Sequence, residues 1–572
     1  MKILNITLIL ALLLGISLPA QAQQKTWCNP VDIDYTYMIY DAHKDISYRS
    51  GADPAVVEFR NEYYMFVTRS MGYWHSEDLL HWDFVKPEDW YFQGSNAPAA
   101  FNYKDSVLYM TGHPSGSMSV LYSDDPASGK WEATPSILHR LQDPALFIDD
   151  DGQAYMFWES SNVDPVHGKK LDKNHRFRPS DSIVGLFNLE AQKHGWERFG
   201  ENHSDSSRGW IEGPWMTKHN GTYYLQYAAP GTQFNIYADG VYTSDDPLGP
   251  YEYAPNNPVS YKPGGFANGA GHGSTVKGPR DNYWHFATSS ISVNVRWERR
   301  IMMFRSHFDE DGLMHTNTYF GDYPHYAPLV HGKAGKFTGW MLLSYDKPVQ
   351  ASSSLQDHGP GKVVDENIRS FWVAQENNDR QWLKMDLEKP VKVHATQVNY
   401  HDYKSDKYGR IPGLYHRYVI EGSKDGENWT TLVDKSDSYE DPPNDYPELA
   451  EPQTVRYIRF KNIHCPTRNL AISGLRIFGR GQGNPPDKVE NLQVDRLKDR
   501  REANIKWEPS EDAQGYNVLW GIAPDKLYNS WMVYDKSRLN LRALSVGQSY
   551  YFKVEAFNEN GISDRTPAIK VE

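Results

Sequence analysis

Three carboxylic acids in the first half of the chain stand at related positions, each just before a short apolar run. Asp53 lies in Ala52-Asp53-Pro54, Asp143 in Gln142-Asp143-Pro144 and Glu212 in Glu212-Gly213-Pro214. Hydrolysis of a glycosidic bond needs two carboxyl groups across that bond, one that activates water and one that donates a proton to the leaving oxygen. An acid before a proline also caps turns, which is the structural alternative for any single motif. Three such acids in equivalent places favour chemistry.

The acids belong to a repeated unit that the chain must position around one point. Each unit has an apolar run, a polar turn and a second apolar run, which is the pattern of a β-hairpin. Five copies at a spacing of tens of residues predict radial repetition, hence an all-β chain that begins with a five-bladed β-propeller. The residues that precede the first strand of each blade then converge near the axis. They include Asp53, Asp143, Glu212 and His272.

The three acidic motifs, in this order, resemble the family 43 glycoside hydrolases. The resemblance covers residues 27–330 and implies a five-bladed propeller that cleaves glycosidic bonds with inversion. It implies that Asp53 is the general base, that Glu212 is the general acid, and that Asp143 is the pKa modulator that orients the acid. Five-bladed families that act on sucrose are a poorer match, because they have Arg-Asp-Pro and Glu-Cys elements where this chain has Gln142-Asp143-Pro144 and Glu212-Gly213.

Aromatic and basic side chains near these motifs are candidates for binding sugar. Trp74 or Tyr73 could stack on a sugar ring, and packing in the core is the alternative for both. Trp215 lies beside the predicted acid, and either Arg299 or Arg300 could carry a sugar-binding arginine. The sequence does not decide between the two arginines.

His272 is the candidate for a contact with a metal ion. It matches a family histidine that supports the active site and helps to hold a central hydrated cation, and a buried, hydrogen-bonded histidine is the alternative. The resemblance implies no required cofactor. A structural calcium ion could lie at the propeller centre or in the second domain.

The chain divides into four predicted segments. Residues 1–22 read as a signal peptide, with Lys2, a short apolar core and a cleavage site at Ala20-Gln21-Ala22, which predicts a periplasmic or secreted protein. Residues 23–345 form the propeller. Residues 349–480 resemble a discoidin (coagulation-factor type C) β-sandwich, a jelly roll that often binds carbohydrate, and residues 485–572 resemble a fibronectin type III sandwich. In the second domain, Asp365-Glu366-Asn367 resembles a calcium-binding loop, with a simple turn as the alternative.

Composition narrows the class of partner. The formal net charge of −13 argues against a nucleic-acid partner, and no later stretch is apolar enough to span a membrane. Aromatic residues make up 14% of the chain, which suits both sugar stacking and packed β-cores. Cys28 and Cys465 are the only cysteines, and two buried thiols are favoured over a bridge between distant segments.

The predicted substrate is a plant-type poly- or oligosaccharide. α-L-Arabinofuranosidase and β-xylosidase are the leading activities, within a class that removes arabinose-, xylose- or galactose-type residues from plant polysaccharide or arabinogalactan side chains. A catalytically silent glycan-binding or adhesion protein is the alternative, and the intact acid trio argues against it. A retaining enzyme would need its carboxyl groups about 5–5.5 Å apart. Because the trio lies within the propeller, deletion of residues 349–572 is expected to spare hydrolysis of small substrates.

Overall fold

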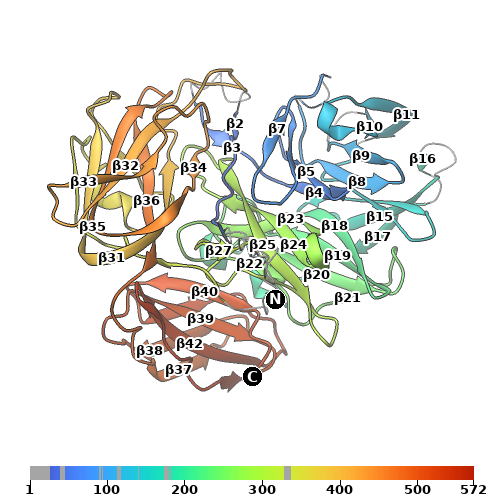
Figure 1. The fold of residues 1–572 in the computed structure, drawn as a ribbon. Coiled ribbons are helices and arrows are strands. Elements are labelled where there is room, and N and C mark those ends of the chain that lie inside the picture. The colour runs from blue at the N-terminus through green and yellow to red at the C-terminus, as the bar shows by residue number, and fades with distance from the viewer. Residues whose placement is uncertain are drawn as a thin grey trace, which may run out of the picture.

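The computed structural model describes residues 26–38, 46–88, 92, 94–112, 117–139, 141–172, 178–179, 182–327 and 337–572. The predicted signal peptide lies outside the described residues. Figure 1 shows three lobes: a propeller drawn in blue to green, a β-sandwich in yellow to orange, and a second sandwich in red beneath them both.

The propeller has five antiparallel blades, as the sequence predicts. The fourth and fifth are joined by a parallel pairing of Ala238 with Ala270. The blades comprise β4 (Ala55–Phe59), β5 (Glu62–Phe66), β6 (Tyr73–Ser76) and β7 (Asp83–Val85); β8 (Ala99–Tyr103), β9 (Ser106–Met110), β10 (Ser117–Ser123) and β11 (Glu132–His139); β12 (Ala145–Ile148), β13 (Ala154–Trp158), β15 (Val166–Asp172), β16 (Arg178–Pro179) and β17 (Val184–Phe187); β18 (Ile211–His219), β19 (Thr222–Ala229), β20 (Ala238–Ser244) and β21 (Glu252–Tyr253); and β23 (Asn268–Lys277), β24 (Tyr283–Ser290), β25 (Arg299–Phe308) and β26 (Met314–Asn317).

The first strands of the five blades close a ring around the axis. β4 contacts β8, β8 contacts β12, β12 contacts β18, β18 contacts β23, and β23 returns to β4. Within a blade the strands alternate in direction, so one face of the ring receives the start of strand one, the end of strand two and the start of strand three. Any site at the axis on this face is therefore built from these three kinds of position.

The second lobe is a β-sandwich around the long, bent strand β31 (Trp382–Tyr400). This strand pairs with β35 (Glu448–His464) along one part and with β36 (Ala471–Arg480) along another. β28 (Met341–Leu342) also pairs with β36. The last residues assigned to the propeller from the sequence, up to residue 345, therefore include a strand of the sandwich.

The third lobe is a two-sheet sandwich. One sheet has the order β37 (Glu490–Arg496), β38 (Ala503–Glu508), β41 (Arg538–Leu541); the other is built on β40 (Asn529–Tyr534), β39 (Gly515–Gly521), β42 (Tyr550–Asn558) and β43 (Gly561–Ile562), with β44 (Ile569–Val571) beside β42. It packs against the polar segment that follows blade three. Gly195 donates its backbone N–H to Leu544, and Val546 donates to Lys193.

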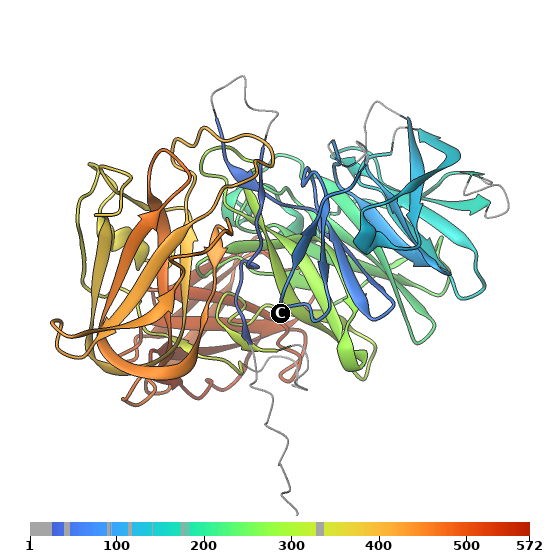
Figure 2. The same ribbon diagram turned by 45° about the horizontal axis from the view of Figure 1, so that its top comes forward.

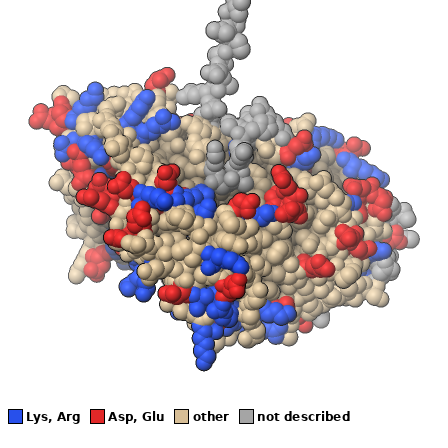
Figure 3. All heavy atoms as spheres, turned by 90° about the horizontal axis from the view of Figure 1, so that it is seen from below, with Lys and Arg blue, Asp and Glu red and all other residues tan. Residues whose placement is uncertain are grey.

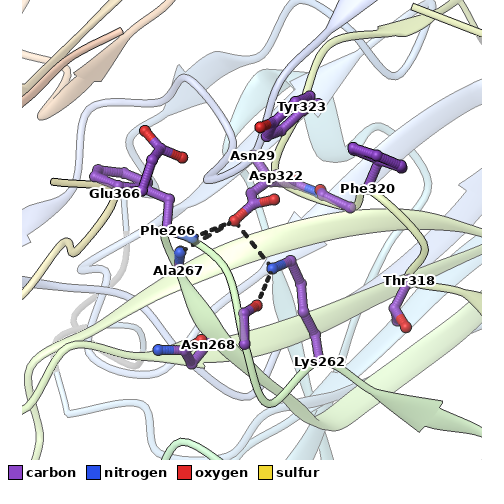
Figure 4. Close-up of polar contacts among 12 residues, drawn as sticks. Asn29, Lys262, Phe266, Ala267, Asn268, Thr318, Phe320, Asp322, Tyr323 and Glu366 are labelled. Atoms are coloured by element: carbon purple, nitrogen blue, oxygen red, sulfur yellow. Dashed lines mark hydrogen bonds and ion pairs between the residues drawn. The ribbon is translucent and has the colours of Figure 1, made fainter. Parts of the chain in front are cut away.

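The three lobes share a hydrophobic core, and the two views of the ribbon agree in placing them against one another (Figures 1 and 2). One buried cluster joins Phe320 of the propeller, Phe478 of the first sandwich and Phe557 of the second. Beside this junction, Asp322 accepts hydrogen bonds from Lys262 Nζ at 3.0 Å and from backbone N–H groups, as Figure 4 shows. The domains are packed parts of one body.

The surface carries charges of both signs, and the two cysteines are buried. Acidic and basic side chains are interspersed on the face seen in Figure 3. Cys28 and Cys465 are both buried and free, which confirms the favoured alternative of two buried thiols. In the described part of the chain, no helix has the length and apolar character that a membrane span requires.

Candidate active site

The five blades begin with the same unusual backbone conformation. One residue near the beginning of each blade has a positive φ: 55° at Asp53, 41° at Ala97 and 46° at Asp143, just before the first strand, and 58° at Gly213 and 49° at His272, within it. L-residues other than glycine rarely adopt this conformation, and it costs about 1–2 kcal/mol at each one. Repetition at equivalent positions shows that the ring imposes it, and the turn directs the side chains of Asp53, Asp143 and His272 toward one another.

Asp53 is held from three sides. Oδ2 accepts a hydrogen bond from Thr68 Oγ1 at 2.6 Å, and Oδ1 lies 3.3 Å from His272 Nδ1 and 3.4 Å from Arg299 Nη1. Its backbone N–H donates to Thr288 Oγ1 at 2.8 Å. Burial alone would raise the pKa of Asp53, but the Arg299 and His272 charges and the Thr68 hydroxyl hold it below its usual value. The carboxylate is therefore kept ionised.

Asp143 lies near the same nitrogen of the imidazole as Asp53. Its Oδ2 lies 3.8 Å from His272 Nδ1, and only 9% of its side chain is exposed. Burial raises the pKa of Asp143, and the neighbouring Glu212 and Asp53 carboxylates raise it further, against the lowering effect of His272. His272 itself has a raised pKa: burial would lower it, but the surrounding carboxylates, Asp53 first among them, outweigh burial.

Glu212 lies one residue before the position with the positive φ, because Gly213 takes the place that Asp53 and Asp143 hold in their blades. A Cβ on Gly213 would lie 2.5 Å from His272 Cδ2, so a side chain there would collide with the imidazole. The Glu212 carboxyl group binds two hydroxyl groups: Tyr237 donates to Oε1 at 2.6 Å and Ser160 donates to Oε2 at 3.1 Å. Burial and the nearby Glu212 raise the pKa of Tyr237, which keeps this hydroxyl protonated.

The two kinds of carboxyl group have contrasting surroundings. Asp53 faces the cation Arg299, which favours its ionised form, whereas Glu212 is bound by neutral hydroxyl groups. The lowered pKa of Asp53 suits activation of water. The two hydroxyl groups hold the Glu212 carboxyl group in a fixed position at the same site.

Comparison with protein families agrees with this site. Residues 44–314 match the model of glycosyl hydrolases family 43, residues 348–473 match the F5/8 type C domain, and residues 487–572 match the fibronectin type III domain. Residues 44–314 are a family 43 glycosyl hydrolase domain. The two sandwich domains match the families that the sequence predicts.

Curated relatives match part of this chain. A xylan 1,3-beta-xylosidase from Vibrio sp. is 26% identical over 39% of this chain and 45% of its own length. A beta-D-galactofuranosidase from Aspergillus niger is 30% identical over 35% of this chain and 52% of its own length. A xylosidase/arabinosidase from Butyrivibrio fibrisolvens is 27% identical over 36% of this chain and 42% of its own length. The chain thus spans about half the length of the curated relatives it matches.

Solved structures of glycoside hydrolases also match. A glycoside hydrolase is 21% identical, covers 75% of this chain and 97% of its own, and has a TM-score of 0.45. The GH43 BlXynB protein from Bacillus licheniformis is 15% identical, covers 92% of this chain and 98% of its own, and has a TM-score of 0.41. The architecture of the family 43 domain described above rests on its own strand pairings.

Three of the predicted sugar contacts are corrected by the structure. Tyr73 and Trp74 are 0% and 1% exposed and belong to blade cores, where Tyr73 donates to the Pro126 carbonyl and Trp74 donates to Asp34. Neither can stack on a ligand in this structure. Arg300 points away from the family 43 site toward the first sandwich, with Nη2 3.7 Å from Asp402 Oδ2. Arg299 is the arginine that reaches the acids.

Trp215 lies among the inner strands, where its indole N–H donates to the Thr275 carbonyl at 3.1 Å and its ring packs on a neighbouring core. Two other tryptophans lie on the acid-bearing face of the family 43 domain. Trp210 is 40% exposed and precedes Glu212 by two residues. Trp297 is partly exposed and lies against the guanidinium of Arg299, 5.5 Å from its Cζ.

The sequence analysis missed several polar residues of the site. Thr68 follows the second strand of blade one. Thr232, which accepts a hydrogen bond from Arg299 at 3.4 Å, and Tyr237 both lie between the second and third strands of blade four. All three belong to connections between second and third strands. These connections open on the same face as the blade starts, and that topological rule was the available signal.

The predicted metal positions have other partners. Glu366 makes a two-pronged ion pair with Arg476, with N–O distances of 2.9 and 2.8 Å, and Asp365 accepts the backbone N–H of Asn367 in a turn. Nδ1 of His272 faces carboxylates. Among the described residues, no group of three or more His, Cys, Asp or Glu side chains is arranged to hold a metal ion. Calcium therefore stays a prediction, and no step below depends on it.

Proposed function

We propose that this protein is an inverting glycoside hydrolase, exported to the periplasm or secreted, that acts on plant-type poly- or oligosaccharides. The observation that carries the proposal is the convergence of three carboxyl groups on one buried site, where Asp53 is held ionised beside Arg299 and Asp143 lies near both Asp53 and Glu212. The family 43 match of residues 44–314 supports the same reaction class.

In the proposed mechanism, Asp53 accepts a proton from a water molecule as that water attacks the anomeric carbon. Glu212 donates its proton to the glycosidic oxygen, and the bond to the leaving group breaks. Arg299 and Thr68 hold the Asp53 carboxylate in place, while His272 lies beside both Asp53 and Asp143. The product sugar then leaves with inverted configuration.

The proposed substrates carry arabinose-, xylose- or galactose-type residues, and α-L-arabinofuranosidase or β-xylosidase is the leading activity. The names of the relatives support this range, since they include a xylosidase, a xylosidase/arabinosidase and a galactofuranosidase. Trp210 and Trp297 are the aromatic side chains best placed to stack on a sugar ring.

A panel of aryl glycosides, followed by proton NMR of the first anomer formed, tests this proposal. We expect hydrolysis of at least one pentoside or galactofuranoside, with inversion. Asp53→Asn, and Glu212→Gln assayed on an oligosaccharide, should each lower kcat by roughly 10²–10⁴-fold, which is typical for loss of one general acid or base. No release of sugar from any substrate would favour a silent glycan-binding protein, and retention would contradict the assignment of Asp53.

A further inference from the structure

A buried ion cluster joins the first sandwich domain to the propeller beside the active site. Asp402 follows β31 of the sandwich, and its side chain is 0% exposed. Oδ1 accepts a hydrogen bond from Arg49 Nε at 2.9 Å, and Oδ2 accepts the backbone N–H of Arg49 at 2.8 Å. Arg49 begins β3 (Arg49–Ser50), four residues before Asp53. One carboxylate from the sandwich thus binds both the side chain and the backbone of the segment that leads to Asp53.

The same carboxylate is linked to the strand that carries Arg299. Arg300 Nη2 lies 3.7 Å from Asp402 Oδ2, and Arg300 Nη1 donates to the carbonyl groups of Arg49 at 2.6 Å and Arg299 at 3.0 Å. Arg300 therefore ties the two segments together while it faces Asp402.

Hydrogen bonds between the two segments complete the connection. The Gly51 N–H donates to the Arg299 carbonyl at 3.2 Å, and Ser50 Oγ accepts the Arg299 N–H at 3.1 Å. Displacement of residues 49–51 must therefore displace Arg299, whose guanidinium touches Asp53.

We propose that Asp402 of the sandwich domain is a positioning residue for the Asp53–Arg299 pair in the propeller. The inference rests on the proposed function only for its kinetic readout. On this proposal, the sandwich contributes to catalysis through the ion pairs that hold residues 49–53 and 299–300. This contribution is separate from any binding of carbohydrate by the sandwich.

The cost of removing Asp402 follows from its burial. Arg49 and Arg300 are 1% and 2% exposed, and a buried cation that loses its partner strongly destabilises its surroundings. Arg49 loses its close ion pair with Asp402 but retains Asp441 at 3.0 Å, and Arg300 loses a contact at 3.7 Å but retains the nearby Glu298. The charged or titratable groups around Asp402 include Arg49, Arg300, Glu298, Asp441, His401 and Tyr37. Those around Asp53 are Arg299, His272, Asp143 and Tyr237.

The test is the pH profile of kcat/KM for Asp402→Asn in the full chain. Arg299 holds the pKa of Asp53 down against burial, so withdrawal of Arg299 should raise that pKa. The acid limb of kcat/KM, which reports protonation of the base in the free enzyme, should then move to higher pH. A misplacement of about 1 Å can also cost ~10²-fold in rate, so we expect a fall of that order near neutral pH. Loss of folded protein alone would lower the rate without moving the limb.

Glu366→Gln is the matched control. It breaks a buried ion pair whose arginine, Arg476, also reaches across the same interface to the Asp322 carbonyl at 2.7 Å, yet it contacts none of the catalytic groups. It should lower Tm and leave the acid limb unmoved. Arg299→Lys should move the limb in the same direction as Asp402→Asn. If Asp402→Asn does not fold, Arg300→Lys tests the same link, because it keeps a cation but loses the two carbonyl contacts.

The outcomes separate the inference from the proposed function. An acid limb unmoved in both Asp402→Asn and Arg300→Lys, in an enzyme that Asp53→Asn inactivates, would overturn the positioning role alone. Absence of turnover in the wild type would count against the proposed function. A crystal structure of the folded variant would then decide the inference: Arg299 displaced from Asp53 supports it, and the contact retained at 3.4 Å overturns it.

Discussion

At the scale of single residues, one imidazole organises the acids. His272 Nδ1 lies between Asp53 and Asp143 at 3.3 and 3.8 Å, and the three side chains share charge in a buried space. Arg299 adds a second cation, which makes an ion pair with Asp53 and has a smaller effect on Asp143. The asymmetry leaves Asp53 with a lowered pKa and Asp143 with a raised pKa, although the two occupy equivalent positions in their blades.

The raised pKa of Asp143 gives a prediction about stability. The folded state binds its proton more tightly than the unfolded state, whose aspartates titrate near ~4. The contribution of Asp143 to the free energy of unfolding therefore falls as the pH rises from about 4 toward its folded pKa. Asp143→Asn removes this penalty, so its Tm relative to wild type should increase from pH 5 to pH 8 in thermal scans.

Asp149→Asn provides a control of opposite sign. The pKa of Asp149 is lowered, since its hydrogen bonds from Lys218 and Tyr223 outweigh the effect of burial, so this group stabilises the fold above its unfolded pKa and loses that effect in acid. The Asp149→Asn variant should have a lower Tm than the wild type at pH 7, and the difference in Tm should be smaller near pH 3. A Tm difference for Asp143→Asn that does not change with pH would show that Asp143 is not protonated more readily in the folded state.

At the scale of elements, the blade starts combine strain with function. A left-handed residue turns the chain into each inner strand, and in blade four this residue is Gly213 because the His272 ring fills the adjoining space. The substitution of glycine moves the acidic residue one place back, to Glu212. The acid thus reaches the site from a different backbone position than Asp53 and Asp143.

Gly213→Ala should therefore lose both stability and turnover. The positive φ of 58° costs an alanine about 1 kcal/mol, and the new Cβ would meet His272 at 2.5 Å, so the imidazole must move away from Asp53 and Asp143. Gly221→Ala is the matched control, because Gly221 also has a positive φ, 87°, but open space around it. Both variants should have a lower Tm than the wild type in calorimetry, and only Gly213→Ala should have a lower kcat. Equal kcat values would contradict a role for His272 in arranging the acids.

At the scale of the whole molecule, the three domains form one packed unit. Besides the cluster around Asp402, the second sandwich contributes Trp520 and Trp531, which pack edge-on against Tyr261 of blade four. The polar segment that follows blade three binds this sandwich through Gly195 and Lys193. The fibronectin-like domain therefore packs against the family 43 domain.

Deletion of residues 349–572 should abolish soluble, active protein, contrary to the expectation from the sequence. The truncated propeller would expose the apolar junction around Phe320 and leave Arg49, Arg300 and Lys262 at a newly opened surface. Soluble yield, Tm and hydrolysis of a small glycoside, compared with the chain of residues 23–572, measure the effect. A soluble propeller with wild-type kcat/KM would show that the sandwiches are dispensable for the site.

The sequence by itself determined the five blades, the two sandwiches and the positions of the three acids. Alternating apolar residues, turn residues such as Asn220-Gly221 and the repeat of acid-proline motifs are local signals, and the first strands of a propeller must converge. Asp53, Asp143 and His272 could be placed together for that reason, without knowledge of any contact between blades.

Only the tertiary structure decided which neighbours of these residues face the site. Arg299 and Arg300 are adjacent on one strand, so their side chains point to opposite sides; the sequence cannot say which side faces Asp53 and which faces Asp402. Trp74 is an aromatic residue of the type that stacks on sugars, but it lies in a blade core. Asp402 approaches Arg49 across a separation of more than 300 residues. Such contacts depend on how whole domains pack, and no local pattern encodes them.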